Sequence, residues 1–307
     1  MTYALFSTCA NGLGAAIFSG FASPLAAISW SASDTVFSFG FIELRWYGLL
    51  FALGFIIGYQ IFSRIYKIEG RPQEDLDILL TYIALATIIG ARLGHCFFYD
   101  PEYYLSNPIE IFQPWKGGLA SHGGTIGILI ALFLYTRKRP DQPYLWLLDR
   151  IVIPIALAGA FIRMGNLMNS EIYGGTTDLP WGFIFELRGE TEPKHPTQIY
   201  EALSYLSLFV MLVFMYLKDK RVLPSGRIFG TFLVVLFGAR LLIEFVKNVQ
   251  EEWEIDLIAA TGLNMGQWLS VPFILVGFYF LVRSFSPKAK QEAIDFDAKF
   301  SKKSTKS

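Results

Sequence analysis

Residues 117–127 read Gly-Gly-Leu-Ala-Ser-His-Gly-Gly-Thr-Ile-Gly and run into an apolar stretch that ends at the basic residues 137–139. The apolar residues 119–135 come close to the ~20 that an α-helix needs to cross a bilayer. This stretch therefore predicts a transmembrane helix with His122, one of three histidines in the chain, at its entrance. Because five of the eleven residues are glycine, backbone or a ligand can approach this entrance closely.

Six further apolar runs of similar length surround this segment. The 307-residue chain is 53% hydrophobic and only 17% charged, against about 25% charged residues in soluble domains. The other runs are residues 46–62, 78–98, 145–167, 196–217, 228–246 and 267–282. The sequence therefore predicts an all-α integral membrane protein built as a bundle of seven transmembrane helices.

Basic residues alternate between the predicted loops. Lys and Arg gather after the first, third and fifth helices and in the tail after the seventh, and the other loops are poorer in base. The last of these other loops carries Glu251, Glu252, Glu254 and Asp256. Because base-rich loops mark the cytoplasmic side, we predict an N-terminus outside and a cytoplasmic C-terminus.

Three regions follow from this pattern. Residues 1–30 are expected to form an interfacial or loosely ordered lead-in, with an eighth span as the alternative. They contain no Lys or Arg, which the start of a signal peptide would require. Residues 31–285 are expected to form the seven-helix catalytic domain, and residues 286–307 a basic cytoplasmic tail.

Several classes of protein are disfavoured by composition. The formal net charge is zero, which gives no sign of a nucleic-acid partner. Cys9 and Cys96 are the only cysteines and form neither a disulfide framework nor a metal motif. The three histidines are scattered, so no metal site is predicted.

Polar residues within the predicted spans fall at one level, the outer half of the membrane. Charged groups at membrane depth cost at least ~2.5 kcal/mol each on insertion scales, so they seldom lack a function. The residues at this level are Tyr47, Arg92, His122, Arg163, His195, Gln198, Glu201 and Arg240. We therefore predict a single polar cavity to which several helices contribute.

Spacing supports this cavity. His195, Gln198 and Glu201 are three residues apart and share one helix face, and Arg240 and Glu244 are four apart and are candidates for an ion pair. Arg163 and Asn166 are also three apart, with Asn169 and Glu171 following at the end of the helix. Glycine pairs let membrane helices approach closely. These pairs are Gly54/Gly58, Gly90/Gly94 and Gly123/Gly127.

Structural interpretations compete with the functional one. A lone arginine near a helix end can snorkel to the interface, and this applies most to Arg92. His122 can be a structural histidine in a glycine-rich turn, and Arg240–Glu244 can be a purely structural pair. Tyr47 can be an ordinary aromatic residue of the membrane interface.

Arginines at the depth of lipid phosphates would form an anion site, since guanidinium binds phosphate oxygens bidentately and stays charged when desolvated. A nearby histidine supplies a base that titrates near neutral pH. Together these groups favour group transfer from a phospholipid. The alternative is a polytopic transporter with an anion site near the outer face, although transporters place polar groups at mid-depth.

The same residues form a series of motifs in a fixed order between about residues 40 and 285. The motifs are Arg45-Trp46-Tyr47-Gly48, Gly90-Ala91-Arg92-Leu93-Gly94, Ser121-His122-Gly123-Gly124, Arg163-Met164-Gly165-Asn166, Asn169-Ser170-Glu171-Ile172-Tyr173-Gly174, His195-Pro196-Thr197-Gln198-Ile199-Tyr200-Glu201, Gly238-Ala239-Arg240 with Glu244, and Met265-Gly266-Gln267-Trp268. In these motifs the chain resembles the phosphatidylglycerol–prolipoprotein diacylglyceryl transferase family.

The resemblance implies a bacterial enzyme of the cytoplasmic (inner) membrane whose active site lies towards the outer half. It would transfer the sn-1,2-diacylglyceryl group from phosphatidylglycerol to the lipobox cysteine of a prolipoprotein signal peptide. The products would be a thioether and glycerol 1-phosphate. The expected partners are these two substrates and membrane lipids, and no cofactor is expected.

The resemblance also suggests roles for the residues. Arg163 and Arg240 would bind the lipid phosphate, and His122 would be either the base for the thiol proton or a ligand of the lipid headgroup. Tyr47 and Glu201 complete the expected catalytic set. The expected substrate-binding residues are Arg92, Gly123, Gly124, Arg163, Asn166, Glu171, Gly174, His195, Gln198 and Glu244. One departure is Leu236, where the family often has a tyrosine one turn before Arg240.

Overall fold

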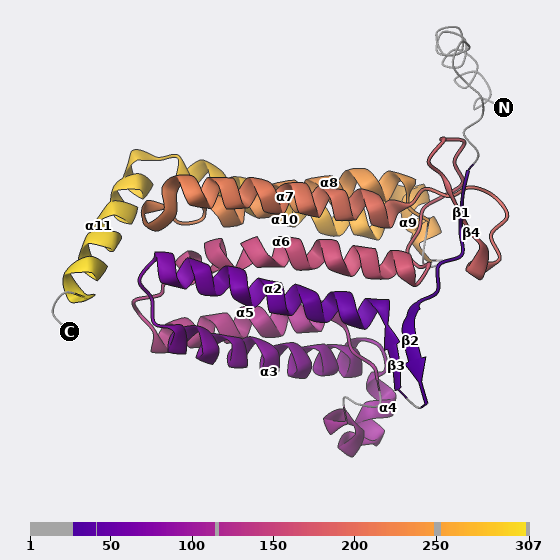
Figure 1. Ribbon diagram of the computed structural model, residues 1–307, viewed down its shortest axis with the longest axis horizontal. Coiled ribbons are helices and arrows are strands. Elements are labelled where there is room, and N and C mark those ends of the chain that lie inside the picture. The colour runs from indigo at the N-terminus through magenta and orange to yellow at the C-terminus, as the bar shows by residue number, and fades with distance from the viewer. Residues whose placement is uncertain (1–26, 41, 114–116, 249–252, 305–307) are drawn as a thin grey trace, which may run out of the picture.

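The computed structural model describes residues 27–40, 42–113, 117–248 and 253–304. Seven long helices run side by side in it (Figure 1). They are α2 (Trp46–Ile68), α3 (Gln73–Phe98), α5 (Ser121–Lys138), α6 (Tyr144–Met168), α7 (Thr197–Asp219), α8 (Arg227–Ile243) and α10 (Met265–Ser284). Each corresponds to one predicted apolar run, which confirms the helical bundle.

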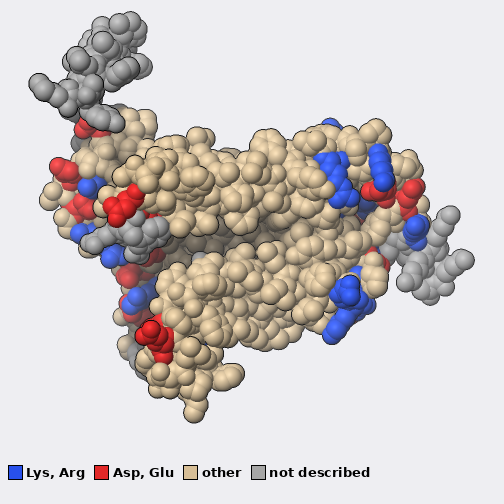
Figure 2. All heavy atoms as spheres, turned by 180° about the vertical axis from the view of Figure 1, so that it is seen from behind, with Lys and Arg blue, Asp and Glu red and all other residues tan. Residues whose placement is uncertain are grey.

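Six of these helices, all except α5, are long and apolar enough to cross a membrane within the described residues. Charged side chains gather at the two ends of the bundle and leave an apolar middle (Figure 2). An apolar band between two charged ends is what a bilayer requires of a spanning protein. The chain is therefore a multi-pass membrane protein.

Helix α6 occupies the centre of the bundle. It contacts α2 and α7 extensively and α8 and α5 less, and it lies between α2 and α7 (Figure 1). In α6, 61% of the most apolar window is buried inside the protein, against 17% in α2 and in α10. A central helix surrounded by others is the place where polar side chains can avoid lipid.

Glycine contacts bring α3 and α5 together. A Cβ atom added at Gly123 would lie 2.4 Å from the carbonyl oxygen of Gly90, and one added at Gly94 would lie 2.7 Å from Cα of Gly123. Between α2 and α6, a Cβ added at Gly54 would lie 3.2 Å from Cβ of Ala158. The predicted close approach at glycine pairs is therefore confirmed for these positions.

A buried polar network holds the base-rich end of the bundle. Glu69 pairs with Arg150 at 2.9 Å and accepts hydrogen bonds from Trp146 at 3.0 Å and Tyr216 at 3.1 Å. Asp149 accepts hydrogen bonds from the backbone nitrogens of Gly226 and Phe229, which begin α8. Each of these carboxylates has its hydrogen-bond donors within the network, so we interpret the network as structural.

Short elements outside the bundle were not predicted from the sequence. Strands β2 (Thr35–Phe39) and β3 (Ile42–Arg45) form an antiparallel hairpin before α2, and β1 (Ile28–Trp30) pairs in parallel with β4 (Phe183–Phe185). The remaining helical elements are α4 (Pro101–Ser106), η1 (Pro108–Phe112), η3 (Glu186–Arg188), η4 (Lys220–Val222), η5 (Glu244–Val246), α9 (Trp253–Thr261) and α11 (Pro287–Ser304).

The predicted terminal regions are only partly visible. Residues 28–30 of the expected lead-in form β1, and residues 1–26 lie outside the described part of the chain. Most of the expected basic tail forms the helix α11, which lies across the base-rich end of the bundle (Figure 1).

Candidate functional site

A chain of alternating charges lies at the end of the bundle that also carries β1 and β4. Arg163 of α6 places Nε 2.8 Å from Oε2 of Glu201 on α7. The other carboxylate oxygen of Glu201 lies 3.4 Å from Nζ of Lys247, which in turn lies 3.6 Å from Oε2 of Glu244. The Glu201 side chain is 0% exposed and that of Lys247 only 4% exposed. Because unpaired buried charges are costly, these four groups depend on one another.

A second layer orients Arg163. Its terminal nitrogen donates to Oδ1 of Asn166 at 3.1 Å, and the amide of Asn166 donates to Oε1 of Glu171 at 2.7 Å. Asn169 donates to the same oxygen at 3.1 Å. The spacing of Arg163 and Asn166 thus places them together, as the sequence predicted.

The chain turns sharply after α6 to bring Glu171 back. Ser170 and Ile172 both have positive φ, 52° and 61°, a conformation that side-chain-bearing residues rarely adopt. Such backbone strain concentrates at functional sites. The turn is held by hydrogen bonds of 2.7 Å from Gln198 to the carbonyl of Glu171 and from Thr197 to that of Ile172.

Gly174 fixes the far end of this turn. Its nitrogen donates to the carbonyl of His195 at 2.8 Å, and a Cβ added to it would lie 2.2 Å from the carbonyl oxygen of Val246. Only glycine fits at position 174, between the backbone segments that contain His195 and Val246. The His195 ring points its Nδ1 to the hydroxyl of Tyr200 at 3.2 Å.

Tyr205, Tyr47 and Arg240 complete the surroundings of Arg163. Tyr205, a residue only 6% exposed, lies close enough to Arg163 and Arg240 to interact with both of them electrostatically. Tyr47 packs against Gly165, where an added Cβ would lie 2.9 Å from the Tyr47 ring.

Arg240 does not form an ion pair with Glu244, although their spacing of four residues made them candidates for one. Glu244 faces Lys247, and its carboxylate fills the space beside Gly266, where an added Cβ would lie 2.6 Å from it. Among the residues that the structure describes, none forms a hydrogen bond or ion pair with the side chain of Arg240. Its guanidinium is therefore available for an anion.

Three buried oxygens at this end of the bundle lack hydrogen-bond donors within the described residues. They are Oε1 of Gln198, Oε2 of Glu201 and Oε2 of Glu244, of which the last two have only ion-pair contacts. Buried acceptors normally have a donor. The hydroxyl groups of a ligand are donors of the kind that these oxygens lack, and an anionic group is the partner that the Arg240 guanidinium lacks.

The remaining predicted site residues belong to α3, α5 and the chain between them. Arg92 donates hydrogen bonds of 2.5 Å to the carbonyls of Glu110 and Gly117 and stacks 4.9 Å over the ring of Tyr104. It therefore fastens the segment after α3 onto that helix. Gly123 is part of the glycine contact described above, and Gly124 is buried beside Ala91 and Thr87.

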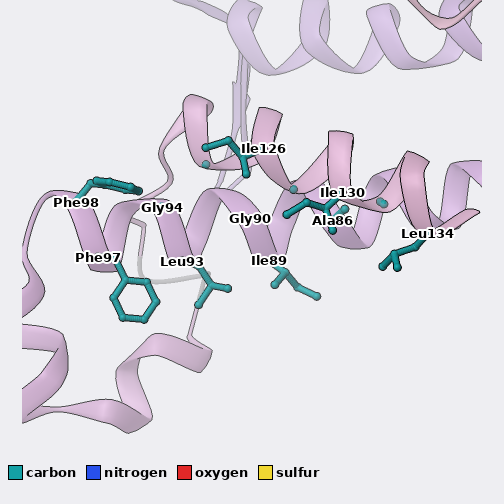
Figure 3. Close-up of a pocket in the computed structure, with 13 residues that line it drawn as sticks. Ala86, Ile89, Gly90, Leu93, Gly94, Phe97, Phe98, Ile126, Ile130 and Leu134 are labelled. Carbon is teal, nitrogen blue, oxygen red and sulfur yellow. The ribbon is translucent and has the colours of Figure 1, made fainter. Parts of the chain in front are cut away.

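His122 is exposed, and its ring contacts are with aromatic residues of the α3 end. The ring centroids of Phe98 and Tyr99 lie 5.5 Å and 5.8 Å from that of His122. Phe98 also borders an apolar groove of about 370 Å³ between α3 and α5, lined by Ile89, Leu93 and Phe97 on one side and by Ile126 and Ile130 on the other (Figure 3). An apolar groove on the outside of a membrane bundle faces lipid chains.

The structure thus divides the predicted residues into a group around α6, α7 and the end of α8, against which Tyr47 of α2 packs, and an α3–α5 group. It also adds Lys247 and Tyr205, which the sequence analysis missed. Tyr205 lies one helical turn after Glu201 and Lys247 three residues after Glu244, so helical spacing was an available signal. Within the described residues, no group of three His, Cys, Asp or Glu side chains could hold a metal ion.

Fold and site together define a multi-pass membrane protein with a buried cluster of alternating charges at one end of its helices. The family model for prolipoprotein diacylglyceryl transferases matches residues 34–283. This chain is 50% identical to a protein of Tolumonas auensis named phosphatidylglycerol–prolipoprotein diacylglyceryl transferase, over 85% of this chain and 99% of the relative. It is 48% and 45% identical to proteins of the same name from Porphyromonas gingivalis and Chloroherpeton thalassium, in each case over 84% of this chain and 94% of the relative. The chain belongs to the prolipoprotein diacylglyceryl transferase family.

Proposed function

We propose that this protein transfers the sn-1,2-diacylglyceryl group of phosphatidylglycerol to the lipobox cysteine of a prolipoprotein. The products are a thioether-linked lipid and glycerol 1-phosphate. The observation that carries the proposal is the Arg240 guanidinium, which has no hydrogen-bond or ion-pair partner among the described residues and lies at the same end of the bundle as buried, unsatisfied acceptors on Gln198, Glu201 and Glu244. Phosphatidylglycerol has a group for each: its phosphate can accept hydrogen bonds from the guanidinium, and the two hydroxyls of its glycerol headgroup can donate to the buried acceptors.

The bundle is proposed to have seven spans, with α5 as the seventh. Its 18 residues cover about 27 Å at 1.5 Å per residue, close to the hydrocarbon thickness, and its polar ends lower its mean hydropathy. The helices α2, α5 and α10 end with a basic residue in their last turn, as does α7. This supports a cytoplasmic base-rich end in a bacterial inner membrane, an N-terminus outside, and an active site towards the outer half.

The proposed domain division keeps residues 31–285 as the catalytic bundle, 1–30 as a lead-in and 286–307 as a cytoplasmic tail. Within the catalytic bundle, Arg163 and Arg240 hold the phosphate. Asn166 and Glu171 orient Arg163, and Gly174 keeps the turn that carries Glu171 in place.

The reaction forms a bond between the cysteine sulfur and the terminal glycerol carbon of the diacylglyceryl group. The bond between that carbon and a phosphate oxygen breaks, and its electron pair stays on the oxygen. Arg163 and Arg240 stabilise the charge that develops there, because preorganised cations act strongly in a water-poor site. The nucleophile is the thiolate, so the thiol proton must pass to a base.

His122 is proposed as that base, with the role of a headgroup ligand as the alternative. The exposed ring at the start of α5 can meet a substrate that enters from the lipid. Arg92, Gly123 and Gly124 shape the α3–α5 wall beside His122. The carbonyl of His195, which accepts a hydrogen bond from Gly174, holds the turn after α6 in place. Tyr47 and Tyr205 line the Arg163 side of the site.

If His122 is the base, His122→Gln lowers kcat/KM about 10²- to 10⁴-fold. The variant also loses the fall in rate at acid pH that protonation of a histidine base causes. The measurement is a pH–rate profile with phosphatidylglycerol vesicles and a lipobox peptide. A profile whose shape is the same in wild type and variant assigns His122 to headgroup binding instead.

The function itself is tested with purified protein, phosphatidylglycerol and a synthetic lipobox peptide. We expect a peptide whose mass rises by one diacylglyceryl group and an equal amount of glycerol 1-phosphate. A peptide with Ser in place of its Cys is the control and should stay unmodified. Absence of a thioether product with the Cys peptide, from protein that keeps its helical circular dichroism, contradicts the proposal.

A further inference from the structure

A pocket lined by charged residues lies at the base-rich end of the bundle. The ends of α7 and α11 that line it are at the opposite end of the bundle from β1 and β4 (Figure 1). It has a volume of about 270 Å³ and lies between the end of α7, the start of α8 and the C-terminal helix α11. Lys218, Arg227 and Lys290 contribute to its lining, together with Asp219. Three separate segments therefore bring cations to one place.

The charges in this pocket do not balance. Arg227 pairs with Asp219 at 3.1 Å and donates to the carbonyl of Ser284 at 2.9 Å, so this cation and this carboxylate satisfy each other. Within the described residues, the side chains of Lys218 and Lys290 form no ion pair or hydrogen bond. Two ammonium groups thus remain for an external anion.

The pocket also has an apolar wall at the membrane boundary. Val222 and Ile294 line it and are 41% and 42% exposed. The apolar span that includes α7 ends at Val222, and the span of α8 begins at Arg227. The lysines therefore lie at the depth of lipid phosphates, with apolar side chains beside them.

We propose that this pocket binds an anionic phospholipid of the leaflet at the base-rich end. Its phosphate lies between Lys218 and Lys290, and its glycerol and upper acyl chains cover Val222 and Ile294. Because Lys290 and Ile294 belong to α11, the lipid holds this helix against α7 and α8. A soluble anion would match the two lysines but not the apolar wall, which favours a lipid.

The test compares binding of dioleoylphosphatidylserine and dioleoylphosphatidylcholine to the detergent-purified full chain by native mass spectrometry. Phosphatidylserine is anionic but lacks the glycerol headgroup of the proposed substrate. We expect Lys218→Gln with Lys290→Gln to weaken retention of phosphatidylserine about 30-fold, or about 5-fold for each juxtamembrane charge. Phosphatidylcholine should bind weakly to both proteins. The matched control, Lys288→Gln with Lys299→Gln, removes two exposed α11 lysines that do not line the pocket and should bind like wild type.

Ile294→Asn separates a lipid from a free anion. It should weaken retention of phosphatidylserine and leave the diacylglyceryl transfer assay unchanged, since Ile294 lies at the other end of the bundle. Equal retention of phosphatidylserine by wild type and the Lys218/Lys290 variant overturns the proposal. So does displacement of the lipid by millimolar inorganic phosphate together with an Ile294→Asn variant that binds like wild type, because the pocket would then hold only a soluble anion.

Discussion

Replacing Arg240 by lysine should reduce kcat/KM for diacylglyceryl transfer at least about 100-fold, the scale of loss when one preorganised electrostatic donor is removed. The charge is kept, but lysine cannot make the two parallel hydrogen bonds by which guanidinium holds a phosphate. The loss should appear in kcat, because the bonds strengthen as charge moves onto the leaving phosphate. Thermal stability in detergent should not change, since the Arg240 side chain has no hydrogen bond or ion pair with another described residue.

Arg221→Lys is the control for this substitution. Arg221 pairs with Asp297 at 2.6 Å at the opposite end of the bundle, so the same chemical change there should leave transfer at the wild-type rate. Both proteins are assayed with phosphatidylglycerol vesicles and a lipobox peptide. Near-normal turnover by Arg240→Lys would refute bidentate phosphate binding at this position and leave Arg163 as the remaining candidate.

Long apolar runs were sufficient to predict the bundle because burial in lipid demands them. Helix ends were harder to predict. Helix α2 continues to Ile68 and α3 begins at Gln73, whereas the predicted runs ended at residue 62 and began at 78. Charged residues at these ends leave the hydrocarbon but keep their helical hydrogen bonds, so hydropathy does not detect them. The β1–β4 pairing was missed because it joins residues 28–30 to 183–185, and three-residue strands have no usable periodicity.

Spacing within one helix correctly grouped Arg163 with Asn166 and Gln198 with Glu201. The expectation that His195 shares their helix face was wrong, because α7 begins at Thr197 after the cap residue Pro196 and His195 lies before it. Contacts across helices were less accessible. The expected pairing of Arg240 with Glu244 assumed an unbroken α-helix, but α8 ends at Ile243 and residues 244–246 form a tighter 3₁₀ turn. In such a turn residues three apart eclipse one another, which directs Glu244 to Lys247. The positive φ of Ser170 and Ile172 is equally invisible, because neither is glycine.

Glu201→Gln should be the most destabilising single substitution in the site. Glu201 is 0% exposed and is the one carboxylate that contacts both Arg163 and Lys247, at 2.8 Å and 3.4 Å. Glutamine keeps the shape but leaves two buried cations without their shared counter-ion. Removing one partner from a buried ion pair costs about 3–5 kcal/mol. We expect a lower thermal midpoint in detergent and, because Arg163 loses the group that positions it, loss of transfer activity.

Glu190→Gln is the matched control, because Glu190 also pairs with a lysine, Lys194, at 3.2 Å, but at a more exposed place. The hydrogen bond from the Tyr173 hydroxyl holds the pKa of the Glu190 carboxyl below its ordinary value, so this variant also removes a full negative charge at neutral pH. Exposed pairs contribute about 0–1 kcal/mol, and the thermal midpoint should hardly move. If both variants unfold at the wild-type temperature, Arg163 and Lys247 do not depend on Glu201 for their charge balance. Glu171 and Glu244 would then have to supply it, and each of those carboxylates should in turn become sensitive to the same substitution.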